Sequence, residues 1–319
     1  MNARAARATA VWVIALALLA VAGGTRLNAQ TPAMLRVGAL PTDGTSVVFY
    51  AKEMGFFERA GLTVDITTMS SGPAIAAAVA GGALDIGIAN VATVAQARAR
   101  GLPLRFIAPS SVAEPATMTD VVMVAAGSVL RTGADLNGKT IAINGLKDLQ
   151  QIAASAWVDK HGGDAKTLRF VEIPIPQMAT ALEAHRADAA LVVEPFVSVA
   201  RAQGQGRVIG DVLDGVGERY MITGWLAMDP WLQAHRDAAA RYVAAIRGAA
   251  EWANAHHRES GAILVKNSKI APELVETMAR AKFGTTLEPA LLRPVIEGAV
   301  RYSVLDARPD INDLVWRAP

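Results

Sequence analysis

Short apolar runs alternate along the chain with longer segments in which apolar residues recur every three or four positions. Each apolar run ends in a small polar or glycine-containing turn, and the helical pattern begins directly after it. The clearest examples lie at residues 64–80, 86–100, 140–160 and 190–202. Strands that alternate with helices are typical of parallel sheets, so this pattern predicts an α/β protein. Ligands of such proteins bind at the carboxyl ends of the strands, where helix N-termini expose unpaired N–H groups.

The same pattern divides the chain into two lobes and a helical tail. Residues 34–121 together with 222–319 are expected to form lobe 1, and residues 122–221 are expected to form lobe 2. The chain would cross between the lobes near residues 121–126 and again near 220–228, which makes these segments the expected hinge. The tail after Met228 reads as helical and is expected to pack back on lobe 1.

The predicted elements are short, and the helices have one apolar face. The best-defined helix begins at Asp148, an N-cap residue with Gln151 in the capping-box position, and ends before Gly162-Gly163. The predicted strands span residues 35–40, 63–68, 86–89, 104–108, 121–125, 140–143, 168–173, 189–193, 207–210 and 220–228. The other predicted helices span residues 47–54, 74–80, 91–100, 177–185, 196–202, 261–266, 272–281 and 288–302, with a long helix through 242–250.

The N-terminal segment is typical of a signal peptide. Arg4 and Arg7 precede the uninterrupted apolar run of residues 11–22, and small residues at 20–22 and 27–29 offer cleavage sites. The run is shorter than the roughly 20 apolar residues that a membrane span needs, and an uncleaved anchor is the alternative interpretation. We therefore expect residues 1–29 to be removed on export.

Charge and cysteine content exclude several classes of protein. The chain has 31 basic and 29 acidic side chains, and the predicted signal peptide contains Arg4, Arg7 and Arg26 but no acid. The mature protein is therefore close to neutral, which gives no indication of nucleic-acid binding. The absence of cysteine excludes disulfides, a lipid-anchored cysteine and thiolate metal sites. The histidines have no coordinating spacing, and no nucleophile elbow, Walker loop or dinucleotide fingerprint occurs, so no metal or cofactor is expected.

Four parts of the sequence together resemble one family of binding proteins. They are Pro41–Gly44 with Ala51–Leu62, Gly82–Gly87, Asp135–Ala142, and Ala187–Ala190 followed by Glu194-Pro195-Phe196. In order and spacing these segments are similar to the NMT1/THI5-like periplasmic binding proteins of ABC importers, which include binders of sulfonates, nitrate, taurine and thiamine precursors. The resemblance covers about residues 35–230.

This resemblance implies a two-lobe, type II periplasmic binding protein fold with the ligand between the lobes. It also implies a periplasmic location and delivery of the ligand to a membrane permease with a cytoplasmic ATPase. The expected ligand is a small organic anion or zwitterion of the sulfonate, taurine or nitrate class. The alternative is a pyrimidine-type thiamine precursor or another small heteroaromatic or aromatic carboxylate.

Other roles within the family are less consistent with this sequence. A sensor subunit that presents its ligand to a receptor is compatible with it. Relatives that synthesise a pyrimidine carry a cysteine-rich motif, which this chain lacks, so we expect no enzymatic activity. We expect a monomer that binds a small molecule and no nucleic acid.

The turns between strands and helices supply the candidate binding residues. If these turns face one cleft, their free N–H groups form an anion-binding site, although the serine and asparagine side chains also suit simple helix caps. The expected ligand-binding residues of lobe 1 are Thr42, Asp43, Gly44, Thr45, Ser46, Ser71, Gly72, Asn90 and Thr93.

Lobe 2 adds charged and aromatic candidates. Lys147 is placed to pair with an anion, with simple exposure to solvent as the alternative. Glu194 is placed to accept an N–H from the ligand, with a salt bridge between the lobes or a solvated turn as alternatives. Together with Asp43 and Asp148 it also tempers the anion interpretation, because a pure anion would meet three acids. The expected residues here are Asn144, Lys147, Asp148, Glu194 and Phe196, with Trp225 at the return crossing; core packing is the alternative for both aromatics.

Overall fold

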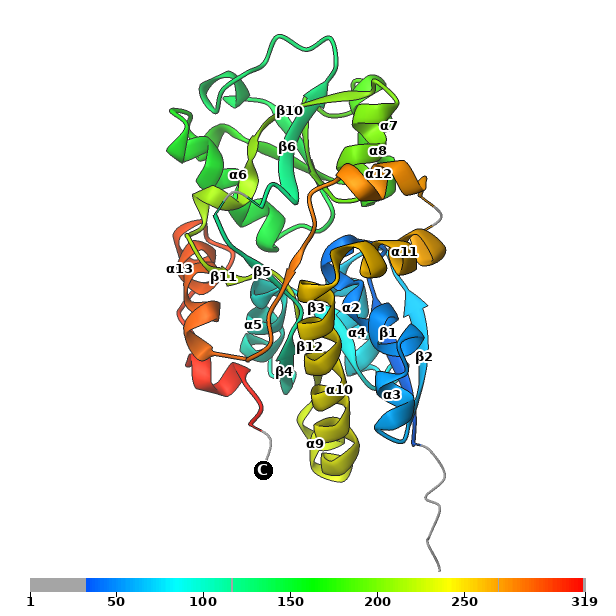
Figure 1. The fold of residues 1–319 in the computed structure, drawn as a ribbon. Helices are drawn as coiled ribbons and strands as arrows, with labels where there is room; N and C mark the ends of the chain where they lie inside the picture. The colour runs from blue at the N-terminus through cyan, green and yellow to red at the C-terminus, as the bar shows by residue number, and fades with distance from the viewer. Residues whose placement is uncertain (1–32, 116, 269, 318–319) are drawn as a thin grey trace, which may run out of the picture. The chain divides into compact units, whose positions relative to one another are not determined.

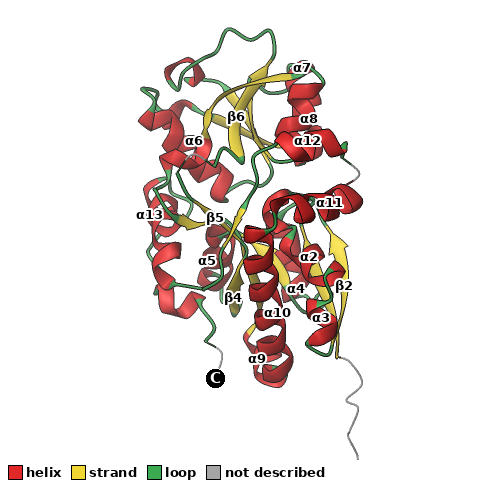
Figure 2. Ribbon diagram, in the orientation of Figure 1, coloured by secondary structure: helices red, strands yellow, loops and turns green. Residues whose placement is uncertain are grey.

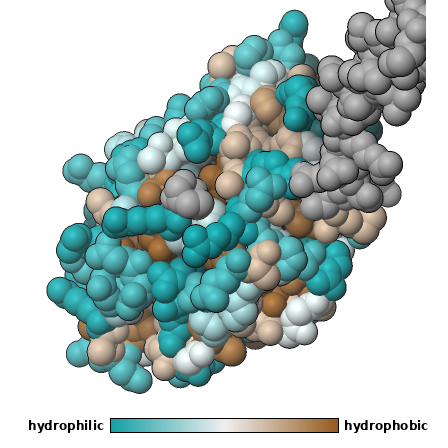
Figure 3. Space-filling model, turned by 90° about the horizontal axis from the view of Figure 1, so that it is seen from below, coloured by the Kyte–Doolittle hydropathy of each residue, from teal (hydrophilic) through white to brown (hydrophobic). Residues whose placement is uncertain are grey.

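The computed structural model describes residues 33–115, 117–268 and 270–317, and the predicted signal peptide lies outside these residues. Two groups of strands are separate in Figure 1, with β1 to β4 in the lower part and β6 and β10 in the upper part. We call them the first and the second lobe. Among the described residues no helix combines the length and the apolar character that a membrane span requires. On the face shown in Figure 3, hydrophilic residues are interspersed with smaller apolar patches.

The first lobe contains all of the described strands that precede residue 115. Its strands are β1 (Ala33–Ala39), β2 (Leu62–Thr68), β3 (Gly87–Ala89), β4 (Leu104–Pro109) and β5 (Ser111–Ala113), with β11 (Tyr220–Met221), β12 (Gly224–Met228) and β13 (Lys282–Phe283) from the later chain. Its helices before the crossing are α2 (Val47–Glu53), α3 (Phe56–Arg59), α4 (Gly72–Ala80) and α5 (Val91–Ala99). These strands form sheets in the orders β1-β2, β3-β12-β4 and β11-β5-β13.

The second lobe is built on one five-stranded sheet in the order β10-β6-β9-β7-β8. Its strands are β6 (Asp120–Ala125), β7 (Thr140–Ile143), β8 (Arg169–Glu172), β9 (Ala189–Val193) and β10 (Gly206–Asp211), and its helices are α6 (Leu149–Lys160), α7 (Met178–Glu183) and α8 (Phe196–Ala202). Helices lie on both faces of this sheet, α6 on one side and α7 and α8 on the other (Figure 2).

Strand β6 shows how the sheet buries both of its faces. Because successive side chains of a strand point to opposite faces, Val122 and Val124 join the large core that includes Trp157 of α6. Val121 and Met123 join a separate core with α7 and α8. All four side chains are almost completely buried, so this strand reads as a continuous apolar run without polar alternation.

The expectation of parallel sheets holds for only some of the strand pairs. β1 pairs with β2 in parallel, and β7 pairs with β8 and β9 in parallel. β6 and β12 instead run antiparallel to their neighbours. These two strands follow the crossings between the lobes, where the chain enters the sheet without a preceding crossover helix. A crossover helix is what makes neighbouring strands parallel, so its absence reverses them.

Two further predictions needed correction in detail. The predicted strand 220–228 is two strands, β11 and β12, separated by Ile222 and Thr223. At the start of α6, Asp148 caps the helix as predicted, but Gln151 Oε1 accepts the N–H of Lys147 at 2.8 Å instead of that of Asp148. The side chain therefore satisfies the N–H one residue before the position that a capping box would use.

The C-terminal tail contacts both lobes. It contains α9 (Asp229–Ala234), α10 (Arg236–Ala255), α11 (His257–Ser268), α12 (Pro272–Thr277), β13 and α13 (Arg293–Arg301). α10 packs on α2 and α3 of the first lobe, as expected. α12 contacts α8, and α13 contacts both α5 and α6, so parts of the tail also reach the second lobe (Figure 1).

The segment between α12 and β13 is fixed to the first lobe by a buried ion pair. Arg280 Nε lies 3.2 Å from both carboxylate oxygens of Asp43, and the N–H of Ala281 donates to the same carboxylate at 2.6 Å. Arg280 also donates to the hydroxyl of Tyr50 at 2.9 Å. The Asp43 side chain is 1% exposed and that of Arg280 is 11% exposed, so water does little to weaken the attraction between the two charges.

We predict that Arg280→Gln destabilises the protein by about 3–5 kcal/mol, because it leaves the Asp43 carboxylate buried without its counter-ion. Urea-induced unfolding measures the loss. The matched control is Arg219→Gln, which breaks the 3.8 Å pair of Arg219 with Glu114, in which the two side chains are 53% and 38% exposed. This control should change the stability little. Equal effects of the two substitutions would contradict the assignment.

Candidate functional site

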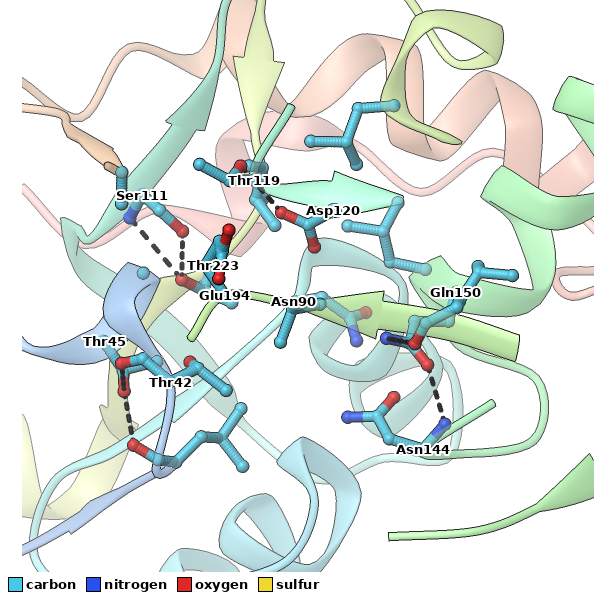
Figure 4. Close-up of a pocket in the computed structure, with 18 of the residues that line it drawn as sticks. Thr42, Thr45, Asn90, Ser111, Thr119, Asp120, Asn144, Gln150, Glu194 and Thr223 are labelled. Carbon is cyan, nitrogen blue, oxygen red and sulfur yellow. Dashed lines mark hydrogen bonds between the residues drawn. The ribbon is translucent and has the colours of Figure 1, made fainter. Parts of the chain in front are cut away.

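A cavity of about 80 Å³ lies between the two lobes. Residues from both lobes line it, and the labelled side chains in Figure 4 surround it. The first-lobe and tail residues are Leu40, Thr42, Asp43, Gly44, Thr45, Gly72, Asn90, Ser111, Val112, Ile222, Thr223 and Ala281. The remaining lining residues are Thr119, Asp120, Asn144, Asp148, Leu149, Gln150, Ala153, Ile175, Leu191, Val193, Glu194, Val212 and Leu213.

Hydrogen bonds join the lobes directly beside this cavity. The backbone N–H of Asp43 donates to the carbonyl oxygen of Glu194 at 3.0 Å. Asn90 Nδ2 donates to Asp148 Oδ2 at 3.4 Å. Outside the lining, Gln96 Nε2 also donates across the lobes to the carbonyl oxygen of Lys147. The turns that follow the strands of both lobes therefore meet at one cavity, which is the arrangement that the sequence predicted.

The turn after β1 is held by its own hydroxyl groups. Thr45 Oγ1 donates to the carbonyl oxygen of Leu40 at 2.5 Å, and Ser46 Oγ donates to that of Thr42 at 3.0 Å. Ser46 therefore does not cap α2 with its side chain. It also lies outside the lining, whereas Thr42, Gly44 and Thr45 belong to it.

Asn90 and Ser71 are both helix caps, but only Asn90 reaches the cavity. Asn90 Oδ1 accepts the N–H of Thr93 at 3.0 Å at the start of α5, and its amide nitrogen faces Asp148. Ser71 Oγ accepts the N–H of Ala74 at 3.4 Å at the start of α4. Gly72 lines the cavity next to Ser71. These caps satisfy the helix N–H groups that the sequence predicted to bind an anion.

Two carboxyl groups of the second lobe also act as helix caps. Asp148 Oδ1 accepts the N–H of Gln150 at 2.8 Å at the start of α6. Glu194 accepts the N–H of Ser198 at 3.1 Å and its hydroxyl at 2.9 Å at the start of α8. Both carboxyl groups lie at the positive ends of helices and accept N–H groups that an anion would otherwise bind. These helix starts are therefore poor sites for a bound anion.

Burial makes these acids hard to ionise. The Asp148 side chain is largely withdrawn from water, and burial raises its pKa to about 7. Burial likewise raises the pKa of Glu194, although its hydrogen bonds with Ser198 oppose the change. Asp43 differs because Arg280 neutralises it. Asp148 and Glu194 thus carry less negative charge at neutral pH than free carboxylates would, and the carboxylate of Asp43 is paired with Arg280.

A fourth acid, Asp120, was missed by the sequence analysis. It begins β6 and lines the cavity, where its Oδ2 accepts the hydroxyl of Thr119 at 2.9 Å (Figure 4). Burial, with a smaller contribution from the nearby carboxyl groups of Asp211 and Glu194, raises its pKa to about 7. A clue was available, because Thr119-Asp120 is a polar pair placed directly before an apolar strand at a lobe crossing.

Asn144 and Gln150 form a polar corner on the second-lobe side. The N–H of Asn144 donates to Gln150 Oε1 at 2.7 Å, and Gln150 Nε2 donates to the carbonyl oxygen of Leu191 at 3.3 Å. The side-chain oxygen of Asn144 is buried and has no hydrogen-bond partner among the described residues. Buried polar atoms are rarely left unpaired, so this oxygen is free to accept a hydrogen bond from a ligand.

Six of the predicted residues lie outside the lining. They are Ser46, Ser71, Thr93, Lys147, Phe196 and Trp225. Trp225 is 0% exposed and packs edge-on against Tyr242, with ring centroids 5.9 Å apart. Phe196 packs partly buried beside the second-lobe core. Lys147 is exposed, as its alternative interpretation held. The aromatic walls that the sequence analysis expected are therefore replaced by aliphatic ones.

The lining combines aliphatic walls with carboxyl, hydroxyl and amide groups. Leu149, Leu191, Val193 and other aliphatic side chains form its apolar part, and no lysine, arginine or aromatic side chain of the described residues lines it. The described residues also contain no group of three or more His, Asp or Glu side chains placed to hold a metal ion. The cavity is therefore suited to holding a small solute through hydrogen bonds and apolar contact.

Known proteins share both sequence and fold with this chain. The family model described as NMT1/THI5 like matches residues 44–260. The protein YtlA of Bacillus subtilis (strain 168) is 24% identical over 236 residues, which cover 72% of this chain and 69% of YtlA.

Two solved structures illustrate the shared fold. The alkanesulfonate-binding protein SsuA from Xanthomonas axonopodis pv. citri, bound to MOPS, matches with a TM-score of 0.76 at 21% identity, covering 90% of this chain and 99% of SsuA. The periplasmic nitrate-binding protein NrtA from Synechocystis PCC 6803 matches with a TM-score of 0.73 at 15% identity, covering 87% of this chain and 83% of NrtA. The predicted two-lobe, type II periplasmic binding protein fold is thus confirmed.

The raised pKa of Asp120 predicts a stability that falls as the pH rises. Its folded-state pKa of about 7 lies above the ordinary value, so the unfolded chain binds fewer protons between pH 4 and 7. We expect Asp120→Asn to raise the free energy of unfolding of the ligand-free protein more at pH 8 than at pH 5. The difference should be about 1–2 kcal/mol, because contact with water in the cavity reduces the effect of the raised pKa.

Urea unfolding at the two pH values measures this difference. Asp65→Asn, which removes an exposed carboxylate of β2, is the matched control and should show no such dependence. If Asp120→Asn behaved like this control, Asp120 would not be a half-buried, uncompensated acid.

Proposed function

Since the chain belongs to the NMT1/THI5-like family, we propose that it is an extracytoplasmic solute-binding protein of an ABC importer. In this role it captures a small solute between its lobes in the periplasm and delivers it to a membrane permease driven by a cytoplasmic ATPase. Binding involves no chemical step. The protein acts as a monomer. The proposed lobes keep the boundaries 34–121 with 222–319 and 122–221 except at the crossings, because β6 begins at Asp120 in the second lobe and β11 pairs with β5 of the first lobe.

The observation that carries this proposal is the cavity between the lobes. It is lined from both sides by the turns at the carboxyl ends of strands, which is where open α/β sheets bind their ligands. The hydrogen bonds of Asp43 with Glu194 and of Asn90 with Asp148 cross from lobe to lobe beside it. A solute held there would contact both lobes at once, so its binding energy favours the closed arrangement.

The lining also narrows the class of solute. The related SsuA and NrtA structures are named as alkanesulfonate-binding and nitrate-binding proteins. A sulfonate or nitrate bound in this cavity would find no lysine or arginine among the described lining residues and would face acidic helix caps at Asp148 and Glu194. Within the classes considered from the sequence, we therefore favour a zwitterion with an amine, or a neutral heteroaromatic compound, over a pure anion.

Closure around such a solute depends on the polar groups that span the cleft. Asn90 contributes to the cap of α5, to the lining and to the bond with Asp148. A buried hydrogen bond of this kind contributes about 1 kcal/mol, and an unpaired partner costs more. We expect the cognate solute to bind with micromolar affinity or better, about −8 kcal/mol.

We predict that Asn90→Ala weakens solute binding about tenfold or more, because both a lining amide and a bond between the lobes are lost. Thermal-shift measurements with taurine, ethanesulfonate, nitrate and 4-aminopyrimidine identify the best ligand, and calorimetry then gives its affinity. Ser71→Ala is the matched control, because it also removes a helix cap but lies outside the lining.

Both substitutions should lower the stability by about 1 kcal/mol through the lost cap. Only Asn90→Ala should weaken binding. If the two variants bound the solute as tightly as the wild type does, the cavity would not be the binding site.

A further inference from the structure

We propose that the solute carries a positively charged nitrogen, as an ammonium or amidinium group, and that Asp120 is the residue that binds it. The side-chain oxygen of Asn144 accepts a further N–H of the solute. This proposal rests on the proposed function, since it names the chemical class that the cavity between the lobes takes.

The first argument is the balance of charge around the cavity. Four acidic residues line it, and no lysine or arginine of the described residues does. Asp43 is neutralised from behind by Arg280. The carboxyl groups of Asp148 and Glu194 accept backbone N–H groups at the N-termini of α6 and α8. Asp120 remains as the acid without a cation or a helix terminus to balance it.

The immediate surroundings of Asp120 reinforce this assignment. Among the described residues its carboxyl group accepts one hydrogen bond, from Thr119, at Oδ2. The titratable groups that act on it are Glu194 after β9 and Asp211 on β10, and Tyr220 on β11 is in turn affected by its charge. None of these groups carries a positive charge. An incoming cation would therefore gain a counter-ion that the protein itself does not supply.

The second, independent argument is the unpaired oxygen of Asn144. This side chain is 8% exposed and lines the same cavity, yet its Oδ1 has no partner among the described residues. Its neighbour Gln150 is engaged with the backbone of Asn144 and of Leu191, so it does not satisfy this oxygen. An N–H group of the ligand would donate to this oxygen and would remove the free-energy cost of leaving a buried acceptor unpaired.

The remaining walls describe the rest of the solute. Val193, Val212, Leu213 and Ile222 are aliphatic. We therefore expect a short aliphatic or compact ring body attached to the cationic group. A sulfonate or carboxylate head in place of the cation would meet Asp120 at close range and be repelled.

Three probes with the same body and different heads test the class of solute. Butylamine is cationic at neutral pH, butan-1-ol is neutral and butane-1-sulfonate is anionic. We expect butylamine to raise the melting temperature of the full chain at millimolar concentration and to bind at least ten times more tightly than the other two. Calorimetry supplies the affinities.

Variants then locate the cationic group. Asp120→Asn should weaken the binding of butylamine about tenfold or more and leave that of butan-1-ol nearly unchanged. Asp65→Asn, an exposed carboxylate outside the lining, is the matched control and should leave all three affinities unchanged. Asn144→Ala should weaken butylamine binding without lowering the stability of the ligand-free protein, because the lost oxygen is unpaired there.

Proton release gives a readout that a purely structural role of Asp120 would not produce. A cation that replaces the proton on Asp120 releases it to the buffer, so butylamine affinity should rise about tenfold from pH 6 to pH 8. Calorimetry in two buffers of different ionisation enthalpy counts the protons. Asp120→Asn should strongly reduce both effects, whereas Asp148→Asn, which removes the other lining acid with a pKa of about 7, should leave most of them in place.

The outcomes separate this proposal from the proposed function. Tighter binding of butane-1-sulfonate or butan-1-ol than of butylamine would overturn the cationic class while the binding function stands. Unchanged butylamine affinity in Asp120→Asn would overturn the assigned residue. If no probe bound, and no small molecule were released from the denatured protein after purification from the periplasm, both proposals would fail.

Discussion

The buried ion pair of Asp43 with Arg280 is the contact on which the rest of the site depends. It joins the turn after β1 to the segment between α12 and β13, which is 237 residues away in sequence. The backbone N–H of the same Asp43 donates to the carbonyl oxygen of Glu194 in the second lobe. One residue thus connects the first lobe, the tail and the second lobe beside the cavity. Its carboxylate is stable at 1% exposure because a guanidinium group and a backbone N–H share its charge.

The cavity shows how helix caps decide the chemistry of a site at strand ends. Helix N-termini attract anions when their N–H groups are free. Here Asp148 and Glu194 occupy two of them, and the uncharged caps Ser71 and Asn90 occupy two others. The site is left with aliphatic walls and with hydroxyl, amide and carboxyl groups. The same fold therefore offers different ligand chemistry depending on which side chains fill the cap positions.

Much of the local structure and part of the site followed from the sequence. The cap of α6 by Asp148 and the strands β7 and β9 were predicted correctly, because capping and apolar periodicity are local properties. Thr42, Gly72, Asn90 and Asn144 lie in the lining as expected, because turns at strand ends share one edge of a sheet. The roles of Asp120 and Arg280 could not be predicted in this way, because each depends on partners distant in the chain.

The sequence by itself determined the order of strands and helices, the turns that approach the ligand and the family resemblance. Only the tertiary structure decided which side chains of those turns face the cavity. Trp225 is in the core and Asp120 is in the lining, although both stand beside an apolar strand at a lobe crossing. The physical reason is that periodicity fixes secondary structure locally, whereas burial and charge pairing depend on which distant segments pack together.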